Sequence, residues 1–171
     1  MDFDELIRAR YSVRKYDSRP VEDEKLRQVL EAGRVAPTGA NKQPVRIYVL
    51  RSAKAIEKVR SLTPCAFDAP VVLLVTVDRD VQWKNPFTPG VFAGEQDASI
   101  VGTQMMLKAT ELGLGTCWVN YFDVNLIHKA FDLPANQTLL YLMPMGYAAP
   151  GAQPNPRHTS RLPLADVVRE L

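Results

Sequence analysis

Cysteine and histidine are scarce in this sequence of 171 residues, which contains only two of each. They are Cys65, Cys117, His128 and His158, and none falls into a Cys-x-x-Cys or His-Glu-x-x-His pattern. Disulfide-rich scaffolds and structural zinc sites need clusters of these residues at fixed spacing, so both classes are excluded. We expect no metal site.

Signatures of dedicated nucleotide binding are also missing. There is no P-loop, and no Gly-x-Gly-x-x-Gly follows a predicted strand. Gly113-Leu-Gly115 lies at the end of a predicted helix, where a C-cap explains it. Cys117 falls within an apolar strand, where a thiol usually fills space, so no nucleophile–base pair is indicated. Any nicotinamide nucleotide would therefore bind transiently.

The composition is that of a globular protein with no extreme charge. Hydrophobic residues make up 46%, charged residues 23%, and the net charge is +2, so neither nucleic acid nor an anionic membrane is indicated as a partner. The length suits one domain, covering residues 1–171. The first residues are acidic where a signal peptide would be basic and then apolar, so we expect a cytoplasmic location.

Hydrophobic periodicity predicts alternating helices and strands, and hence one layered fold of both types. Helices are expected over residues 2–10, 22–35, 52–62, 94–112 and 124–131, and strands over 47–50, 70–77, 116–119 and 138–145. Residues 82–90 are interpreted as a surface loop or flap, 148–156 as extended, and 164–171 as a short helix or an arm.

The helix expected at 94–112 is apolar nearly all round and rich in small residues such as Ala98 and Gly102. Such a helix should be buried on every side. A symmetric partner would cover it, although an ordinary core helix would have the same composition.

Two short segments carry the polar groups that could bind a ligand. Arg10-Tyr11-Ser12-Val13-Arg14 places two guanidinium groups and a hydroxyl close together, which suits a phosphate and a polar ring edge. Pro37-Thr38-Gly39-Ala40-Asn41-Lys42-Gln43-Pro44 is rich in turn formers, with hydroxyl and amide side chains. Taken singly, the first could be a solvated basic patch and the second a plain loop.

Five stretches that follow one another in a particular order along the chain favour a ligand site over these simpler interpretations. They are Arg10 to Arg14, Ala36 to Pro44, Asp97 to Trp118 (ending Glu111-Leu-Gly-Leu-Gly-Thr-Cys-Trp118), Pro144-Met-Gly-Tyr147 and Arg161-Leu-Pro-Leu164. With these motifs the chain resembles the FMN-dependent nitroreductase family over nearly its whole length. The resemblance implies an α+β fold with a mixed, mostly antiparallel central sheet flanked by helices. It also implies an intertwined homodimer with FMN at the interface.

The resemblance assigns the cofactor contacts to three parts of the chain. Arg10, Tyr11, Ser12, Arg14 and Arg161 would hold the phosphate, ribityl chain and ring edge of FMN. Pro37, Thr38 and Asn41 would reach the same flavin from the other subunit. Val119, Asn120 and Tyr121 match the place where family members direct a backbone N–H toward flavin N5. No side chain is expected to act as a catalytic acid or base.

The function implied is reduction of a small-molecule acceptor, such as a nitroaromatic compound or a quinone, with NADH or NADPH as donor. Hydride transfer through flavin N5 would follow ping-pong kinetics, because donor and acceptor use the same flavin face in turn. Other flavin reactions on the same fold, reductive dehalogenation or fragmentation of the flavin, remain open. So do a flavin-binding protein without turnover and an interaction module without flavin.

The chain departs from the family pattern in places. Asn120 and Tyr121 stand where relatives often have small residues, and Tyr121 would narrow the pocket. Val45 replaces the family's aromatic residue after Gln-Pro, at a cost in packing rather than in function.

Overall fold

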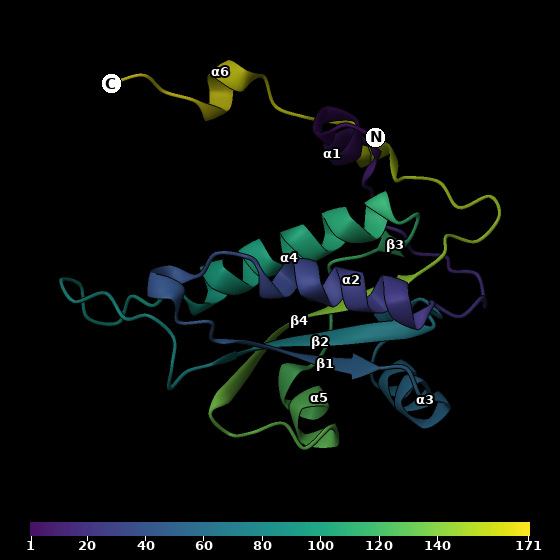
Figure 1. Ribbon diagram of the computed structural model, residues 1–171, viewed down its shortest axis with the longest axis horizontal. Coiled ribbons are helices and arrows are strands. Elements are labelled where there is room, and N and C mark those ends of the chain that lie inside the picture. Colours follow the sequence, from purple (N-terminus) through teal and green to yellow (C-terminus); the bar gives the residue numbers. More distant parts are fainter.

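The computed structural model describes all of residues 1–171. Four strands form one sheet in the order β1-β2-β4-β3. The strands are β1 (Val45–Leu50), β2 (Val71–Asp78), β3 (Gly115–Thr116) and β4 (Gln137–Gly146). The α-helices are α1 (Phe3–Ala9), α2 (Asp23–Arg34), α3 (Ala53–Leu62), α4 (Gly94–Glu111), α5 (Val124–Ala130) and α6 (Leu164–Val167). α2 and α4 cover one face of the sheet, and α3 and α5 cover the other (Figure 1).

The predicted helices and strands are confirmed with small shifts at their ends, except the strand at 116–119. Ser52 caps α3 as its composition indicates, since its side chain accepts the N–H of Ala55. Three short 3-10 turns were not predicted: Gly39–Asn41, Pro64–Ala66 and Pro156–His158. All three strand pairs are antiparallel, and an isolated bridge between Ser12 and Thr116 is parallel.

The strand predicted at 116–119 is shorter than expected. β3 ends at Thr116, and Val119 forms only an isolated bridge with Leu142 of β4. Pro144 explains the gap. Its carbonyl accepts the N–H of Cys117 at 3.2 Å, but proline has no N–H to donate in return on that side of the strand. The hydrogen-bonded pairing of β3 with β4 is interrupted at this position, and the chain leaves the sheet soon afterwards.

β2 is buried from Val71 to Val77 and divides the core into two layers. Its residues Val71, Leu73, Val75 and Val77 face α2 and α4, while Val72 and Leu74 face α3 and α5. An irregularity opposite Val75 and Thr76 shifts the register of β4 by one residue. The continuous apolar run of β2 is therefore satisfied on both faces.

Within the single chain α4 is buried on one side only, so the burial on every side expected for 94–112 stays a prediction that depends on a partner. Ala98, Met105 and Ala109 are fully covered, but Ile100 is 40% exposed and Ser99 and Thr103 are exposed. One face of the longest helix is thus open in the single chain. No helix has the length and apolar composition needed to cross a membrane.

The two ends of the chain lie on the α4 side of the molecule. After β4 the chain turns back toward α1 and continues as an arm that includes α6 (Figure 1). Every residue from Thr159 to Leu171 is exposed, among them Leu162, Leu164 and Val167. The arm packs little against its own chain.

Candidate functional site

Four arginines converge at one cavity. Arg10 and Arg14 come from the extended segment after α1, and Arg157 and Arg161 come from the tail around the Pro156–His158 turn. We call these four residues the cation cluster. With Ser12, Asn155 and His158 they line a cavity of about 260 Å³ that has no hydrophobic residue in its wall.

The sheet edge holds the first half of this cavity. The N–H of Val13 donates to the carbonyl of Thr116 at 2.9 Å, and the N–H of Asp17 donates to that of Tyr147 at 2.9 Å. The close packing of Val13 needs a glycine at 115, where an added Cβ would lie 2.4 Å from a methyl carbon of Val13. Gly115 therefore allows the close packing that holds the segment carrying Arg10 and Arg14.

The tail is attached to α1 by His158. Its Nε2 lies 3.1 Å from the carbonyl oxygen of Arg8, and its ring meets the ring of Tyr11 edge to face at 6.3 Å. Asn155 caps the 3-10 turn by accepting the N–H of Arg157 at 3.0 Å. These contacts bring Arg161 and Arg10 to the wall of one cavity, and their predicted role toward a phosphate stays a prediction.

No carboxylate neutralises the cation cluster. Arg14 donates only to the carbonyl of Ser12, at 3.3 Å, and Arg161 only to the carbonyls of Arg157 and Ser160, the latter at 2.7 Å. None of the four takes part in an ion pair. Like charges gathered without a counter-charge repel one another, so the arrangement favours binding of an anion.

Cys117 lies near the cluster. Burial raises the pKa of its thiol, while the Arg14 cation and a hydrogen bond with Ser12 oppose that rise. The thiol is 2% exposed, and its raised pKa keeps it protonated at neutral pH. The structure gives Cys117 a packing role.

The second predicted segment lies at the other end of α4. The turn Gly39–Asn41 contacts Asp97 in the first turn of this helix, whereas Val13 packs beside Gly115, just after its end. Figure 1 shows the two segments at opposite ends of α4. A helix of 18 residues spans about 27 Å. One chain therefore does not bring Thr38 and Asn41 to the cation cluster.

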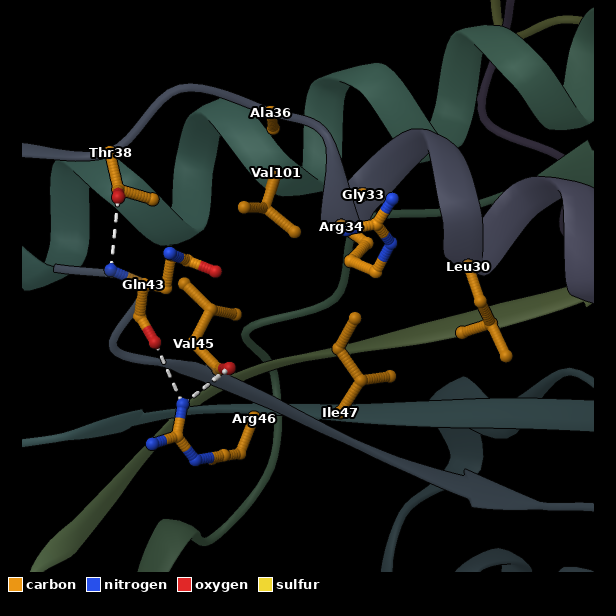
Figure 2. A pocket seen from close by; sticks show the side chains of 10 residues that line it. All are labelled: Leu30, Gly33, Arg34, Ala36, Thr38, Gln43, Val45, Arg46, Ile47 and Val101. Carbon is orange, nitrogen blue, oxygen red and sulfur yellow. Dashed lines mark hydrogen bonds between the residues drawn. The ribbon is translucent and has the colours of Figure 1, made fainter. Parts of the chain in front are cut away.

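Thr38 and Asn41 differ in their availability. The Thr38 hydroxyl accepts the N–H of Gln43 at 3.0 Å and so closes the loop, as Figure 2 shows. Pro37 and Asn41 are exposed, and the side-chain amide of Asn41 makes no hydrogen bond within the chain. This amide is the free polar group of the segment.

A cavity of about 270 Å³ lies behind this loop, between α2, α4 and β1 (Figure 2). Leu30, Val45, Ile47 and Val101 form its apolar floor. The arginines beside it are already paired, Arg34 with Glu31 and Arg46 with Asp78. Thr38 is the one predicted site residue in its wall, and no sequence pattern predicted this cavity.

The third predicted stretch, Val119 to Tyr121, follows the shortened strand β3. Val119 donates its N–H to Leu142 at 3.0 Å, so it has no donor left for a ligand. The N–H groups of Asn120 and Tyr121 have no acceptor within the chain. The Tyr121 side chain is 78% exposed, and its carbonyl accepts the Thr63 hydroxyl at 3.1 Å. Two backbone donors thus remain at this turn.

A stacked pair of rings supports the turn. Trp118 lies on Tyr141 at 3.6 Å between ring centroids, and its Nε1–H donates to the Asn120 side chain at 2.9 Å. Tyr141 donates to the carbonyl of Ala98 at 2.8 Å. A Cβ on Gly102 would lie 2.3 Å from the Tyr141 hydroxyl, so the small residue in α4 makes room for the stack. The orientation of Asn120 is set by core packing.

The loop predicted at 82–90 lies next to Asn41. Asn41 and Lys42 line an open cavity of about 620 Å³ together with residues 80–84. Phe87, at the tip of the loop, is 91% exposed. A flap and a predicted cofactor residue therefore share one surface.

Sequence reasoning missed Asn155, Arg157 and His158 in the wall of the cationic cavity. Residues 148–156 were interpreted only as extended chain. Arg157 lies four residues before Arg161, and that spacing was the available signal.

Comparison with known proteins identifies the family. The model of the nitroreductase family matches residues 7–63 and 60–147. A crystal structure of a nitroreductase family protein from Clostridium difficile 630 is 42% identical, with a TM-score of 0.91 over 99% of this chain and 98% of that one. A structure from Desulfovibrio desulfuricans, described provisionally as a nitroreductase in complex with FMN, is 29% identical, with a TM-score of 0.79 over 98% and 95% of the two chains.

A curated relative gives the same result. A Methanothermobacter thermautotrophicus protein, named provisionally as an NADH dehydrogenase/NAD(P)H nitroreductase, is 31% identical over 156 residues, covering 87% of this chain and 78% of that protein. The motifs, the α+β fold and these matches agree: the chain belongs to the nitroreductase family.

Proposed function

We propose that the protein is an FMN-dependent NAD(P)H oxidoreductase that acts as a homodimer on small-molecule acceptors such as nitroaromatic compounds or quinones. The names of its relatives support the cofactor and the donor. One observation of this chain carries the proposal: four arginines without a carboxylate surround one polar cavity.

The cation cluster fits the phosphate of FMN. Guanidinium groups donate paired hydrogen bonds to phosphate oxygens, and Ser12 adds a hydroxyl. A cavity with no apolar wall is unsuited to a hydrophobic ligand. Arg10, Ser12, Arg14 and Arg161 are therefore proposed to hold the phosphate end, with Arg157 and His158 beside them.

The separation of the two predicted segments supports a dimer. Thr38 and Asn41 lie about a helix length from the cation cluster of their own chain. They can therefore contact a ligand at a cation cluster only if that cluster belongs to a second copy of the chain. A two-fold axis would place each loop at the partner's cluster and would cover the open face of α4 around Ile100. In this arrangement both chains complete each site.

The chain itself offers binding and orientation at the reacting end. The N–H groups of Asn120 and Tyr121 are the donors proposed to face N5, and Val119 acts through the sheet that holds them. Bound FMN supplies the redox chemistry by accepting a hydride from the donor and passing electrons to the acceptor. The exposed Tyr121 and the 82–90 loop would limit which acceptors fit. The single domain over 1–171 and the cytoplasmic location stay predictions.

The test is an absorbance spectrum of the purified protein before and after anaerobic addition of NADH or NADPH. Flavin bands that bleach would support the proposal and identify the donor. Bands that persist would favour a carrier or another flavin reaction. Absence of flavin after reconstitution with FMN would refute the site assignment.

A further inference from the structure

Asp97 is a buried acid with no assigned role. It lies in the first turn of α4 and is 2% exposed. Its Oδ1 accepts the N–H of Gly39 at 2.8 Å, and its Oδ2 is buried without a partner. A buried carboxylate that is half satisfied is costly, so its presence calls for an explanation.

The loop that Asp97 contacts has an unfavourable backbone. Ala40, Asn41 and Gln43 have φ values of 48°, 53° and 49°, in the left-handed region that side-chain-bearing residues avoid. Such conformations persist only where their surroundings hold them. The internal bonds Asn41 N–H to Thr38 and Gln43 N–H to Thr38 close the loop but do not attach it to the body of the protein.

Arg46 of β1 holds the end of the loop by donating to the carbonyl of Gln43 at 2.8 Å, and the start of the loop is attached to α4 at Gly39. A Cβ at this position would lie 3.1 Å from the Cβ atoms of both Ala93 and Trp83, so the backbone sits directly on the start of α4 and on the flap. The hydrogen bond to Asp97 fixes the direction of the Gly39 peptide at this contact. Two residues further on, Asn41 presents its free amide outward.

We infer that Asp97 is a positioning residue for the cofactor site of the partner subunit: it anchors Gly39 so that Thr38 and Asn41 meet FMN held by the other chain's cation cluster. This inference rests on the proposed function. Asp97 of one chain would then affect the FMN that is bound at the cation cluster of the other chain.

The test compares substitutions at Asp97 by FMN affinity, measured by fluorescence titration of the apoprotein. Asp97→Ala removes the acceptor and should weaken binding about ten- to hundredfold, the effect of losing a hydrogen bond to a charged group. Asp97→Asn keeps a carbonyl oxygen for Gly39 and should restore most of the affinity, to within about fivefold of wild type, since a neutral acceptor binds the N–H only somewhat more weakly than a charged one. Glu95→Ala removes the same charge from the same turn at an exposed position and should change nothing.

Three outcomes would overturn the inference. They are wild-type affinity in a folded Asp97→Ala, an Asp97→Asn variant as weak as Asp97→Ala, or an equal loss in Glu95→Ala. If Asp97→Ala does not fold, Asp97→Ser replaces it, because the shorter side chain cannot reach Gly39. A wild-type protein that binds no FMN would instead refute the proposed function, which separates the two failures.

Mixed dimers test the action across the interface. A dimer of one Asp97→Ala chain and one Arg10→Ala chain contains one site with both defects and one site with neither. It should bind one FMN per dimer with wild-type affinity, whereas each homodimeric variant should bind both FMN molecules about ten- to hundredfold more weakly. A mixed dimer in which neither site has wild-type affinity would show that Asp97 does not act on the partner's site.

Discussion

Arginines occupy two contrasting regions of this molecule. On α2 and α3 they are matched with acids: Arg27 pairs with Glu24, Arg34 with Glu31, and Arg60 with Asp68. In the cation cluster, none of the four has a carboxylate partner. The same residue type therefore serves two purposes. Pairs on an exposed helix contribute little stability and keep the surface neutral, whereas unpaired charges that converge provide a site.

The largest effect on FMN binding is expected when the partner subunit is removed and the cation cluster is left intact. Ile100→Glu places a charge on the open face of α4 and should give a monomer that retains no FMN, because the loop of the second chain is then missing. Size-exclusion chromatography and the flavin absorbance of the same fractions measure both effects. A monomer with a full complement of FMN would contradict the shared site.

Truncating one member of the cluster should have the next largest effect. Arg10→Ala removes a charge-assisted contact worth about 1.5–3 kcal/mol, so FMN affinity should fall about ten- to hundredfold. Dialysis followed by an absorbance spectrum measures retention. Arg60→Ala, at a paired arginine on α3, is the matched control and should retain FMN fully.

Arg157 sharpens the comparison from the tail. It is exposed and was not predicted, and a screened surface contact is worth about 0.2–1 kcal/mol. Arg157→Ala should therefore weaken FMN binding by only about two- to fivefold, by fluorescence titration at low salt. An effect as large as that of Arg10→Ala would place the phosphate deeper along the tail than proposed.

The pKa of the Cys117 thiol reports the electrostatic effect of the cation cluster in the absence of a ligand. Burial raises the pKa of this thiol, and the Arg14 cation lowers it. Removing that cation in Arg14→Ala should raise the pKa further, so that less thiolate is present at any given pH. In apoprotein carrying Cys65→Ser, the ultraviolet absorbance of the thiolate should then appear only at a more alkaline pH, a readout that needs no reagent to reach the buried side chain. A shift toward lower pH would contradict the assignment.

The smallest effect is expected where a charge is already paired. A hydrogen bond from Arg34 lowers the pKa of Glu31, so the pair stabilises the fold above the ordinary carboxyl pKa and loses this contribution as the pH falls through the lowered value. Glu31→Gln should leave FMN binding unchanged and reduce stability slightly at neutral pH. Urea titrations should show the difference disappearing on acidification.

Local patterns in the sequence predicted most of the fold. The continuous apolar run of β2 and the periodicity of α2 and α3 depend only on neighbours along the chain. The early end of β3 was not predicted, because it depends on which residue of another strand lies opposite Cys117. The register of Pro144 becomes known only when the sheet is assembled.

The site was predicted in outline by motif order rather than by physics. The placement of Arg10, Ser12, Arg14 and Arg161 around one cavity was predicted, and their role toward FMN stays a prediction. Arg157 and His158 were missed, because the fold of the tail depends on contacts with residues about 150 positions earlier. Asp97 was missed for a similar reason: an acid in the first turn of a helix usually lies in solvent, and only packing shows that this one is buried.

The way the sheet is threaded dictates when the cation cluster can form during folding. β2 pairs with β4 across about sixty intervening residues, and the segment that carries Arg14 is held by bonds to Thr116, Tyr147 and Ala149. Loop closure of this length slows folding and delays the contacts that depend on it. On a ribosome the cluster would be completed only after almost the whole chain had emerged. A cofactor anchored there would stabilise the finished protein but could not guide the early steps of its folding.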